Sequence, residues 1–245
     1  MCVNYTPTRR DQISAKFSAL DQTGEEWRPE AWQDYQAPFI THDELRRRRA
    51  QLGAYSMIPK NKLAPGVKRF STMNARAETI GELTSYAKAW RSAQLCLIPM
   101  QDFFEPNYES GKPERWQIGV INDQERTDFA VAGLYRTWEE ADGQTSFSFT
   151  QVTINADQHP LMSRFHQPDD EKRSLVILPE EDYDEWLACR NPEIARAFLQ
   201  LYPAHKMWAQ SAILPSRKQV KAKLNEDDGA TIIAMPQQAS LFSDH

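Results

Sequence analysis

Runs of apolar residues along the chain predict a core built mainly from β-strands. Five runs combine β-branched and aromatic residues and are bounded by polar or turn-forming residues, a composition typical of strands. They are LCLIP (95–99), RWQIGVI (115–121), DFAVAGLYRTW (128–138), SFSFTQVTI (146–154) and SLVIL (174–178). We therefore expect five core strands.

Short polar segments between successive strands predict hairpin turns. They are ESGKPE (109–114), NDQ (122–124) and ADGQ (141–144). The Asp-Gly pair of the third is the strongest turn signal, because glycine readily adopts the positive φ of tight hairpins. Strands joined by such turns pair antiparallel, so the expected sheet is mainly antiparallel.

The apolar positions change phase inside the segment 146–154. They fall at Phe147 and Phe149 and then at Val152 and Ile154. Because side chains alternate between the two faces of a strand, this shift indicates either a bulge near Thr150 or a strand buried on both faces. Either feature suits a curved, barrel-like sheet.

Helical periodicity is confined to short segments. Spacings of three, four and three predict an amphipathic helix over 77–92, with core positions Ile80, Leu83, Ala87 and Trp90. Two more helices are expected, separated by Pro192, with core positions Tyr183, Trp186 and Leu187, then Ile194, Phe198 and Leu201. The chain contains no repeat and no evident linker, so we expect one α+β domain over 1–220 and a polar, partly mobile tail over 221–245.

Composition indicates a folded intracellular protein. Of the 245 residues, 40% are hydrophobic, which is enough for a buried core. No stretch reaches the roughly 18 apolar residues of a membrane-spanning helix, and residues 1–20 lack the apolar run of a secretory signal. The cysteines and histidines show no metal-ligand spacing, so we expect no metal and no cofactor. We also expect a cytoplasmic monomer.

Charge is divided unevenly along the chain, although the formal net charge is only −5. The segment 46–76 holds nine basic residues and no acidic one: Arg46, Arg47, Arg48, Arg49, Lys60, Lys62, Lys68, Arg69 and Arg76. Such a segment can attract a polyanion to one face of the molecule. The alternative is a solvated helix, in which the four consecutive arginines cover a full turn and cannot all face one ligand.

The cysteine at position 2 is a candidate for unusual chemistry. If Met1 is removed, Cys2 carries an α-amine and a thiol on adjacent carbons, a pair that can trap an aldehyde. An α-amine has a pKa near 8, against about 10.4 for lysine, so more of it is nucleophilic at neutral pH. On these two residues alone, a chance cysteine at an irrelevant terminus is the simpler interpretation.

Three further polar residues are candidates for a site, and each has an ordinary alternative. Asn74 could be a helix N-cap, Glu105 a surface carboxylate and His166 a loop histidine. Glu105 follows Phe103 and Phe104, and partial burial among them would raise its pKa toward neutrality. Only the combination of these residues with Cys2 favours a functional interpretation.

Motifs spread along most of the chain resemble the SRAP family, once described as SOS-response-associated peptidases. They are MC (1–2), YQAP (35–38), SMIP (56–59), NARAET (74–79), LCLIPMQDFFE (95–105), AGLYRTW (132–138), VTINA (152–156), RFH (164–166) and LVILPEEDYDEWL (175–187). The resemblance implies an α+β domain with a curved, barrel-like antiparallel core and flanking helices. It also implies that the processed N-terminal cysteine lies at the base of a groove for single-stranded DNA.

The resemblance further implies a covalent chemistry. In the family, the α-amine of the N-terminal cysteine attacks the aldehyde of an abasic site, and the thiol closes the imine into a thiazolidine DNA–protein crosslink. By position, Cys2 would be the nucleophile, Asn74 would hold its amine, Glu105 would shuttle protons and His166 would assist opening of the sugar ring. Phosphate contacts would come from Arg76, with Lys60, Lys62, Lys68 and Arg69 in support.

The sequence departs from the family pattern around the groove. Val3 and Asn4 follow Cys2 in place of Gly-Arg, KNKLAPGVKRF replaces a tryptophan-containing loop, and QPDDEKRS replaces the usual Arg-Met-Pro after the histidine. Base stacking would then rest on Tyr55 or Phe70. Three functions stay open: abasic-site crosslinking, a thiol autopeptidase or peptidase using Cys2, and non-covalent binding of single-stranded DNA.

Overall fold

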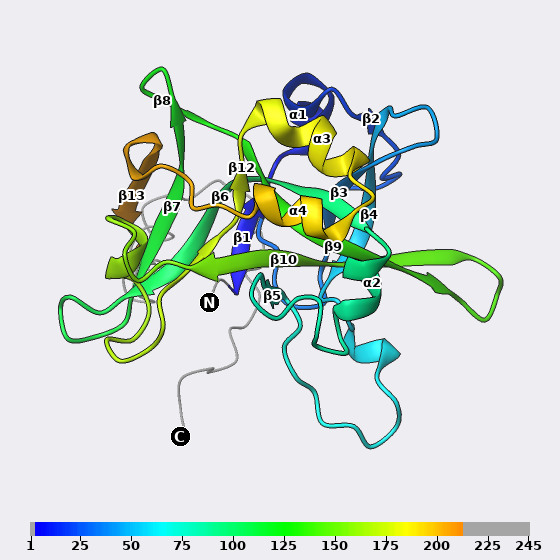
Figure 1. Cartoon of the computed structure of the whole chain (residues 1–245), viewed down its shortest axis with the longest axis horizontal. Helices are drawn as coiled ribbons and strands as arrows, with labels where there is room; N and C mark the ends of the chain where they lie inside the picture. Colours follow the sequence, from blue (N-terminus) through cyan, green and yellow to red (C-terminus); the bar gives the residue numbers. More distant parts are fainter. Residues whose placement is uncertain (1–2, 213–245) are drawn as a thin grey trace, which may run out of the picture. The chain divides into compact units, whose positions relative to one another are not determined.

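Strands are the main regular structure in the part of the chain that the computed structural model describes, residues 3–212 (Figure 1). The strands are β1 Asn4–Pro7, β2 Leu20–Asp21, β3 Gln36–His42, β4 Arg48–Tyr55, β5 Asn74–Arg76, β6 Leu95–Asn107, β7 Glu114–Asn122, β8 Glu125–Thr127, β9 Phe129–Glu139, β10 Thr145–Asn155, β11 Arg173–Leu175, β12 Ile177–Leu178 and β13 Met207–Ser211. The α-helices are α1 Arg10–Phe17, α2 Ala87–Arg91, α3 Tyr183–Ala188 and α4 Pro192–Ala195. Single 3₁₀ turns are η1 Lys60–Lys62, η2 Met162–Arg164, η3 Glu180–Asp182, η4 Arg196–Phe198 and η5 Ala204–Lys206.

Five of the strands within residues 3–212 close into a barrel. Going round the ring, β9 pairs with β10, β10 with β4, β4 with β3, β3 with β6, and β6 with β9 again. Only the β10–β4 junction of this ring is parallel. The other strands extend the sheet: β1 and β7 flank the second half of β6, while β5 and β11 flank the end of β10. The expected α+β fold with a curved, mainly antiparallel core is confirmed.

The hairpin turns agree with the sequence. β6 and β7 are joined by 108–113, β7 and β8 by the turn at Asp123 and Gln124, and β9 and β10 by the turn that contains Gly143. Asp123, Gln124 and Gly143 all have positive φ, which twisted two-strand turns require. The short β8 after the second turn was not expected.

The strand β6 is much longer than the segment 95–99 that was predicted. It continues through Pro99 and Pro106 to Asn107, and most of its residues are buried. Proline seldom lies within a paired strand, because it has no N–H to donate, so the sequence pattern suggested an earlier end. The additional residues pair with β1 and β7, and they include Glu105.

The phase shift in 146–154 reflects burial on both faces. β10 pairs with β9 without interruption from Thr145 to Gln151, so the expected alternative of a bulge near Thr150 is wrong. Residues 148–153 are all buried. Phe149 belongs to a cluster inside the ring, and Val152 belongs to a second cluster outside it.

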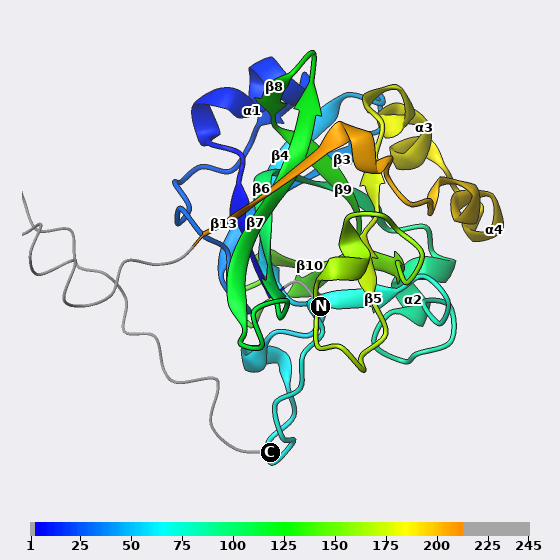
Figure 2. The same cartoon turned by 90° about the vertical axis from the view of Figure 1, so that its left-hand side faces the viewer.

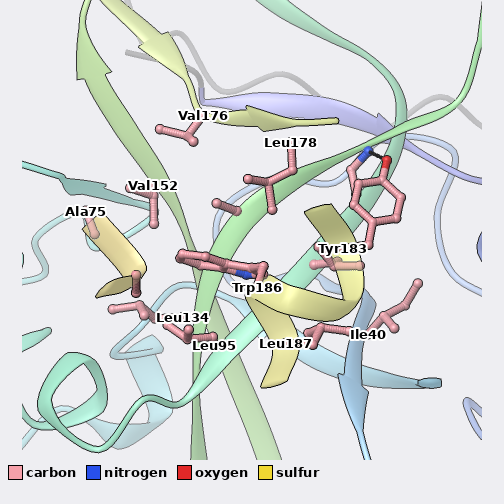
Figure 3. Packing of buried hydrophobic residues seen from close by; sticks show 14 of the residues in the cluster. Ile40, Ala75, Leu95, Leu134, Val152, Val176, Leu178, Tyr183, Trp186 and Leu187 are labelled. Atoms are coloured by element: carbon pink, nitrogen blue, oxygen red, sulfur yellow. Dashed lines mark hydrogen bonds between the residues drawn. The ribbon is translucent and has the colours of Figure 1, made fainter. Parts of the chain in front are cut away.

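These two clusters form an inner and an outer core. The inner core fills the ring with residues from all five of its strands, including Phe39, Tyr55, Ile98, Val131 and Phe149. The outer core lies under the helices and combines alternate residues of the same strands with side chains of α1, α2 and α3. Figure 3 shows Trp186 of α3 seated in the outer core among Val152, Leu178 and Leu134. Strand alternation therefore gives each ring strand two buried faces.

Close packing across the ring depends on one glycine. A Cβ at Gly133 would lie 2.7 Å from Cδ1 of Ile98 and 2.9 Å from Sγ of Cys96. Neither β6 nor β9 could approach this closely with a side chain at position 133. On the other face of the same strands, the indole N–H of Trp186 donates to the carbonyl of Cys96 at 2.9 Å, which fixes α3 against the barrel.

Three local predictions from the sequence are wrong. Ile194 and Leu201, expected as core positions of the last helix, are 59% and 37% exposed. Of the expected helix 77–92, only Ala87–Arg91 is α-helical, and Leu83 is 48% exposed. The segment before it is held by β10 instead, because the N–H of Ala77 donates to the carbonyl of Thr153 at 2.8 Å. The four arginines 46–49 do not form the solvated helix that was considered. They form a hairpin turn and the start of β4, and Arg47 and Arg49 both pair with Asp43.

None of the helices between residues 3 and 212 is long and apolar enough to cross a membrane. The tail expected over 221–245 lies outside the described residues, as do residues 1 and 2 and residues 213–220.

Candidate functional site

A buried carboxylate and a buried histidine meet at one end of the barrel. Glu105 lies two residues after Phe103 of the inner core on β6, so its side chain faces the same interior. Its Oε2 lies 3.1 Å from Nε2 of His166, and the two side chains are only 3% and 4% exposed. The distance is that of an ion pair, but the angles are not those of a hydrogen bond, and neither ring nitrogen of His166 makes a hydrogen bond within residues 3–212.

The backbone on either side of His166 is clamped to the end of β6. The N–H of His166 donates to the carbonyl of Pro106 at 2.9 Å, and Nδ2 of Asn107 donates to the carbonyl of Arg164 at 3.1 Å. Phe165 forms a β-bridge with Asn107 and packs against Trp116. His166 itself has a φ of +67°, in the left-handed region that residues with a side chain adopt uncommonly. The loop histidine is therefore a fixed part of the barrel mouth.

Asn74 begins β5, which lies beside the second half of β10. This strand pairs parallel with β10, and Asn74 lies opposite Gln151. The hydroxyl of Tyr86 donates to the backbone carbonyl of Asn74 at 3.0 Å, and burial raises the pKa of Tyr86 to about 12, so this hydroxyl stays protonated. Asn74 is thus a strand residue, and its alternative interpretation as a helix N-cap is wrong.

Arg76 ends β5 and is held by an acidic loop. Its Nη1 donates to Glu171 at 2.8 Å, and the side chains are 46% and 35% exposed. Glu171 also accepts from Asn155 at 3.0 Å and from the buried Arg173 at 2.7 Å, and these contacts lower its pKa. Arg173 in turn forms a two-bonded pair with Glu78. The guanidinium of Arg76 is partly exposed, but it already has an acidic partner.

The other predicted DNA-binding cations lie along one segment, residues 60–70, which extends away from the barrel in both views (Figures 1 and 2). Lys60 and Lys68 are exposed. Lys62 pairs with Glu140, and Arg69 pairs with Asp34 at 2.6 Å. The structure therefore separates this group from Arg76 and supplies carboxylates to two of its four members.

Of the two aromatic residues considered for base stacking, one is not accessible. Tyr55 is fully buried in the inner core and stacks on Phe149 with ring centroids 5.7 Å apart. Phe70 is 44% exposed and lies on the basic segment. The expectation for Tyr55 is wrong, and Phe70 stays a candidate.

One residue of the site was not predicted from the sequence. Gln151 is fully buried on β10, and its Oε1 accepts a hydrogen bond from the hydroxyl of Tyr55 at 2.9 Å. The available signal was a glutamine within an otherwise apolar or hydroxyl-bearing strand that is buried on both faces. Within residues 3–212, no group of three or more His, Cys, Asp or Glu side chains is placed to hold a metal ion.

Cys2 lies outside the described residues. The chain that follows it enters the fold beside the acid–histidine pair. β1 begins at Asn4, which lies opposite Phe104, the neighbour of Glu105 on β6. The side chain of Asn4 is fixed there by a hydrogen bond of 2.9 Å to Glu30.

Known proteins resemble this chain in both sequence and structure. Residues 1–220 match the family described as SOS response associated peptidase (SRAP). Two proteins of Bacillus subtilis named abasic site processing proteins, YoqW and YobE, are each 32% identical to it. The YoqW match spans 161 residues, 64% of this chain and 67% of YoqW, and the YobE match spans 142 residues, 57% of this chain and 60% of YobE.

Solved structures share the fold of this chain. A crystal structure of a Bordetella bronchiseptica protein superimposes with a TM-score of 0.76 at 32% identity, and the match covers 87% of this chain and all of that one. A protein from Bacteroides thetaiotaomicron shares the fold, with a TM-score of 0.67 at 21% identity and a match that covers 86% of this chain and 91% of that one. The barrel, its buried acid–histidine pair and these matches lead to one conclusion: the chain belongs to the SRAP family.

Proposed function

We propose that this protein captures abasic sites in single-stranded DNA through a covalent bond to Cys2. The observation that carries the proposal is the buried pair of Glu105 and His166, 3.1 Å apart, at the point where the N-terminal strand enters the barrel. Titratable groups in such a setting are typical of sites that transfer protons. The names of the related Bacillus proteins support the choice of an abasic site as the target.

The proposed reaction joins an aldehyde to an aminothiol with loss of one water molecule. The amine of Cys2 attacks C1′ of the ring-opened deoxyribose, and the carbonyl oxygen takes up a proton to give a carbinolamine. This intermediate loses water and becomes an imine. The thiol of Cys2 then adds to the imine carbon and closes a five-membered thiazolidine. The reaction requires removal of Met1, because an acylated nitrogen is not a nucleophile.

The acid–histidine pair supplies the proton transfers. Forming and dehydrating the carbinolamine requires protons to be removed from nitrogen and delivered to oxygen near neutral pH. A carboxyl group and an imidazole can do this, typically for about 10²–10⁴ in rate. His166 would assist opening of the sugar ring, and Asn74, on β5, would hold the amine by hydrogen bonding.

Binding of the DNA strand would depend on the basic side chains that contact its phosphates. Arg76 is the cation that lies on the same short strand as Asn74, two residues away, so a phosphate of the damaged nucleotide can reach it. Lys60, Lys62, Lys68 and Arg69 would contact more distant phosphates. Such contacts release counterions, so affinity should fall as salt rises.

The test uses protein whose N-terminus has been verified as Cys2 and a single-stranded oligonucleotide with one abasic site. On a denaturing gel we expect a shifted band, absent with an intact strand and absent in Cys2→Ala. Cys189→Ala is the matched control, because Cys189 is a partly exposed thiol and should crosslink normally. Cys96 is buried, which raises the pKa of its thiol well above the ordinary value.

Three outcomes would contradict the proposal. A band that persists when Met1 is retained would exclude the aminothiol. Thiol-dependent amide cleavage without any aldehyde would favour a peptidase. Salt-dependent binding with no band, from protein that starts at Cys2, would indicate a non-covalent DNA-binding protein.

A further inference from the structure

Gln151 is buried beside the candidate site with no ordinary structural reason to be polar. It is fully buried on β10, and its side chain follows Phe149 onto the inner face of the barrel. Its partner across the parallel β5–β10 pair is Asn74. Opposite residues of paired strands project to the same face, so the amides of Gln151 and Asn74 share one side of the sheet.

The orientation of the Gln151 amide is fixed from one side only. Tyr55 donates its hydroxyl to Oε1 at 2.9 Å, which directs the amide nitrogen away from Tyr55. The ring of Tyr55 is itself held by Phe149 and by Tyr5, whose centroid lies 5.2 Å away at an interplanar angle of 86°. The carbonyl end of the glutamine therefore has a rigid anchor.

The nitrogen end has no such partner. Within residues 3–212, Nε2 of Gln151 is buried and makes no hydrogen bond. A buried donor without an acceptor costs about 1–3 kcal/mol, and a methionine or leucine at this position would avoid that cost. Pre-arranged donors of this kind are typical of sites that bind an oxygen atom when a ligand arrives.

We propose that Nε2 of Gln151 donates a hydrogen bond to the oxygen on C1′ of the captured deoxyribose. This inference rests on the proposed function. When the amine of Cys2 attacks C1′, the carbonyl double bond becomes a single bond and its electron pair moves onto that oxygen. The oxygen then takes a proton from the acid–histidine pair to become the carbinolamine hydroxyl, and it leaves as water. A neutral donor fits this oxygen, because its charge is transient and is removed by protonation.

The placement of Gln151 favours this oxygen over a phosphate. The predicted phosphate contact, Arg76, is 46% exposed at the end of β5, whereas Gln151 is enclosed in the barrel. Asn74, across the strand pair, is the predicted holder of the amine. The neighbouring amides of Asn74 and Gln151 would therefore orient the two reacting groups. Asn74 would hold the amine nitrogen of Cys2, and Gln151 would hold the oxygen on C1′.

Gln151→Met tests this inference in single-turnover crosslinking. Methionine has a similar length, fills the same space and removes the donor, but it also removes the acceptor of the buried Tyr55 hydroxyl, so we expect a folded protein with a slightly lower Tm. The crosslinking rate at saturating DNA should fall by about 10- to 100-fold, in the range found when one oxyanion donor is removed, or somewhat below it. Affinity for a strand with a tetrahydrofuran site, which lacks the C1′ oxygen, should not change. Gln210→Met, on the exposed strand β13, is the matched control and should crosslink like wild type.

Gln151→Glu is the second variant. It tests whether Gln151 acts by donating a hydrogen bond or only by filling space. The carboxylate can still accept from Tyr55 but cannot donate, so crosslinking should be slow at neutral pH. Protonation at lower pH would restore an O–H donor, so the ratio of its rate to that of wild type should rise as pH falls.

A wild-type rate in Gln151→Met, or a Gln151→Glu ratio that does not vary with pH, would overturn the inference while leaving the proposed function intact. Absence of any crosslink with wild-type protein would overturn both.

Discussion

The acid–histidine pair and the predicted DNA-binding cations, Arg76 and the four of the segment 60–70, are built in opposite ways. Glu105 and His166 are almost completely buried, and their positions are set by backbone hydrogen bonds at the end of β6. The cations lie at the surface, and three of them already pair with carboxylates from distant parts of the chain: Lys62 with Glu140, Arg69 with Asp34 and Arg76 with Glu171. The fold therefore fixes the proposed chemistry, whereas the proposed DNA affinity depends on a competition between phosphates and the protein's own acids.

The largest effect should come from the buried pair. We expect Glu105→Gln or His166→Ala to slow single-turnover crosslinking by about 10²–10⁴-fold, because proton transfers lose their donor or acceptor. DNA affinity should stay within twofold, roughly. Rates and binding can be measured on the same oligonucleotide.

Asp102→Asn is the control for this comparison. Asp102 is a second buried carboxyl group on β6, three residues from Glu105, and its hydrogen-bond partners are Thr6 and Gln117. Burial raises its pKa, as expected for a carboxyl group in such a place. An equal loss of rate in Asp102→Asn would mean that loss of any buried carboxyl group on β6 slows crosslinking, and that the Glu105–His166 pair has no particular role in proton transfer.

A change at the surface should affect binding and leave the chemistry alone. Arg76→Ala should weaken binding roughly fivefold and reduce the slope of log K against log salt by about 0.7, the value for one phosphate contact to a single strand. The crosslinking rate at saturating DNA should be unchanged. Arg126→Ala, whose guanidinium stacks on Trp208, is the control and should leave both quantities as they are. A fall in the saturated rate would place Arg76 with the chemical residues.

The competition itself can be tested with Glu171→Gln. In the free protein a phosphate must displace this carboxylate from Arg76, so removing its charge should tighten binding by roughly two- to fivefold, the size of a partly exposed ion pair. The direction is opposite to that of Arg76→Ala, which makes the result easy to distinguish in a titration. Glu193→Gln, which breaks an exposed pair with Arg196, should have no effect. Weaker binding in Glu171→Gln would show that Glu171 positions Arg76 and does not compete for it.

The smallest effect concerns the other basic cluster, at the β3–β4 hairpin. Burial alone would raise the pKa of Asp43, but the backbone N–H of Arg47 and the guanidinium groups of Arg47 and Arg49 lower it to about 2. A lowered pKa means that the contribution of Asp43 to stability is complete above its unfolded value, about 3.9, and is lost as pH falls through about 2. NMR titration of the Asp43 carboxyl carbon should give a midpoint near 2. A midpoint near 4 would mean that the hairpin pairs do not persist in solution.

The sequence was sufficient for β9 and β10 because their apolar residues reflect burial on both faces, but β3 and β4, two of the five ring strands, were not predicted, and the expected strand 174–178 is divided into β11 and β12 outside the ring. The 128–138 and 146–154 segments became β9 and β10 with a shift of one residue at each end, and their Asp-Gly turn formed as expected. The helix 77–92 failed because its first residues are bonded to β10, a contact that periodicity does not encode. Long-range pairing therefore overrode a genuine helical pattern.

The candidate site was also predictable from the sequence only in part. The motif resemblance identified Asn74, Glu105 and His166; the structure brings Glu105 of β6 and His166 together and places Asn74 on β5, opposite Gln151. It could not identify Gln151, because that residue matters only through its neighbours Tyr55 and Asn74. Tyr55 was misjudged for the same reason, since its exposure is decided by strands that lie far away in the sequence.

The single parallel junction of the ring has a consequence for how the barrel forms. All other ring pairs are antiparallel, and the β3–β4 and β9–β10 hairpins can each form from nearby residues. Joining β10 to β4 brings Ser148 to Ala54, a contact between segments far apart in the sequence, whereas each hairpin joins neighbouring segments. Loop-closure entropy makes such contacts slow. We expect this closure to limit the folding rate, so that a nascent chain acquires its finished barrel only once β10 has left the ribosome.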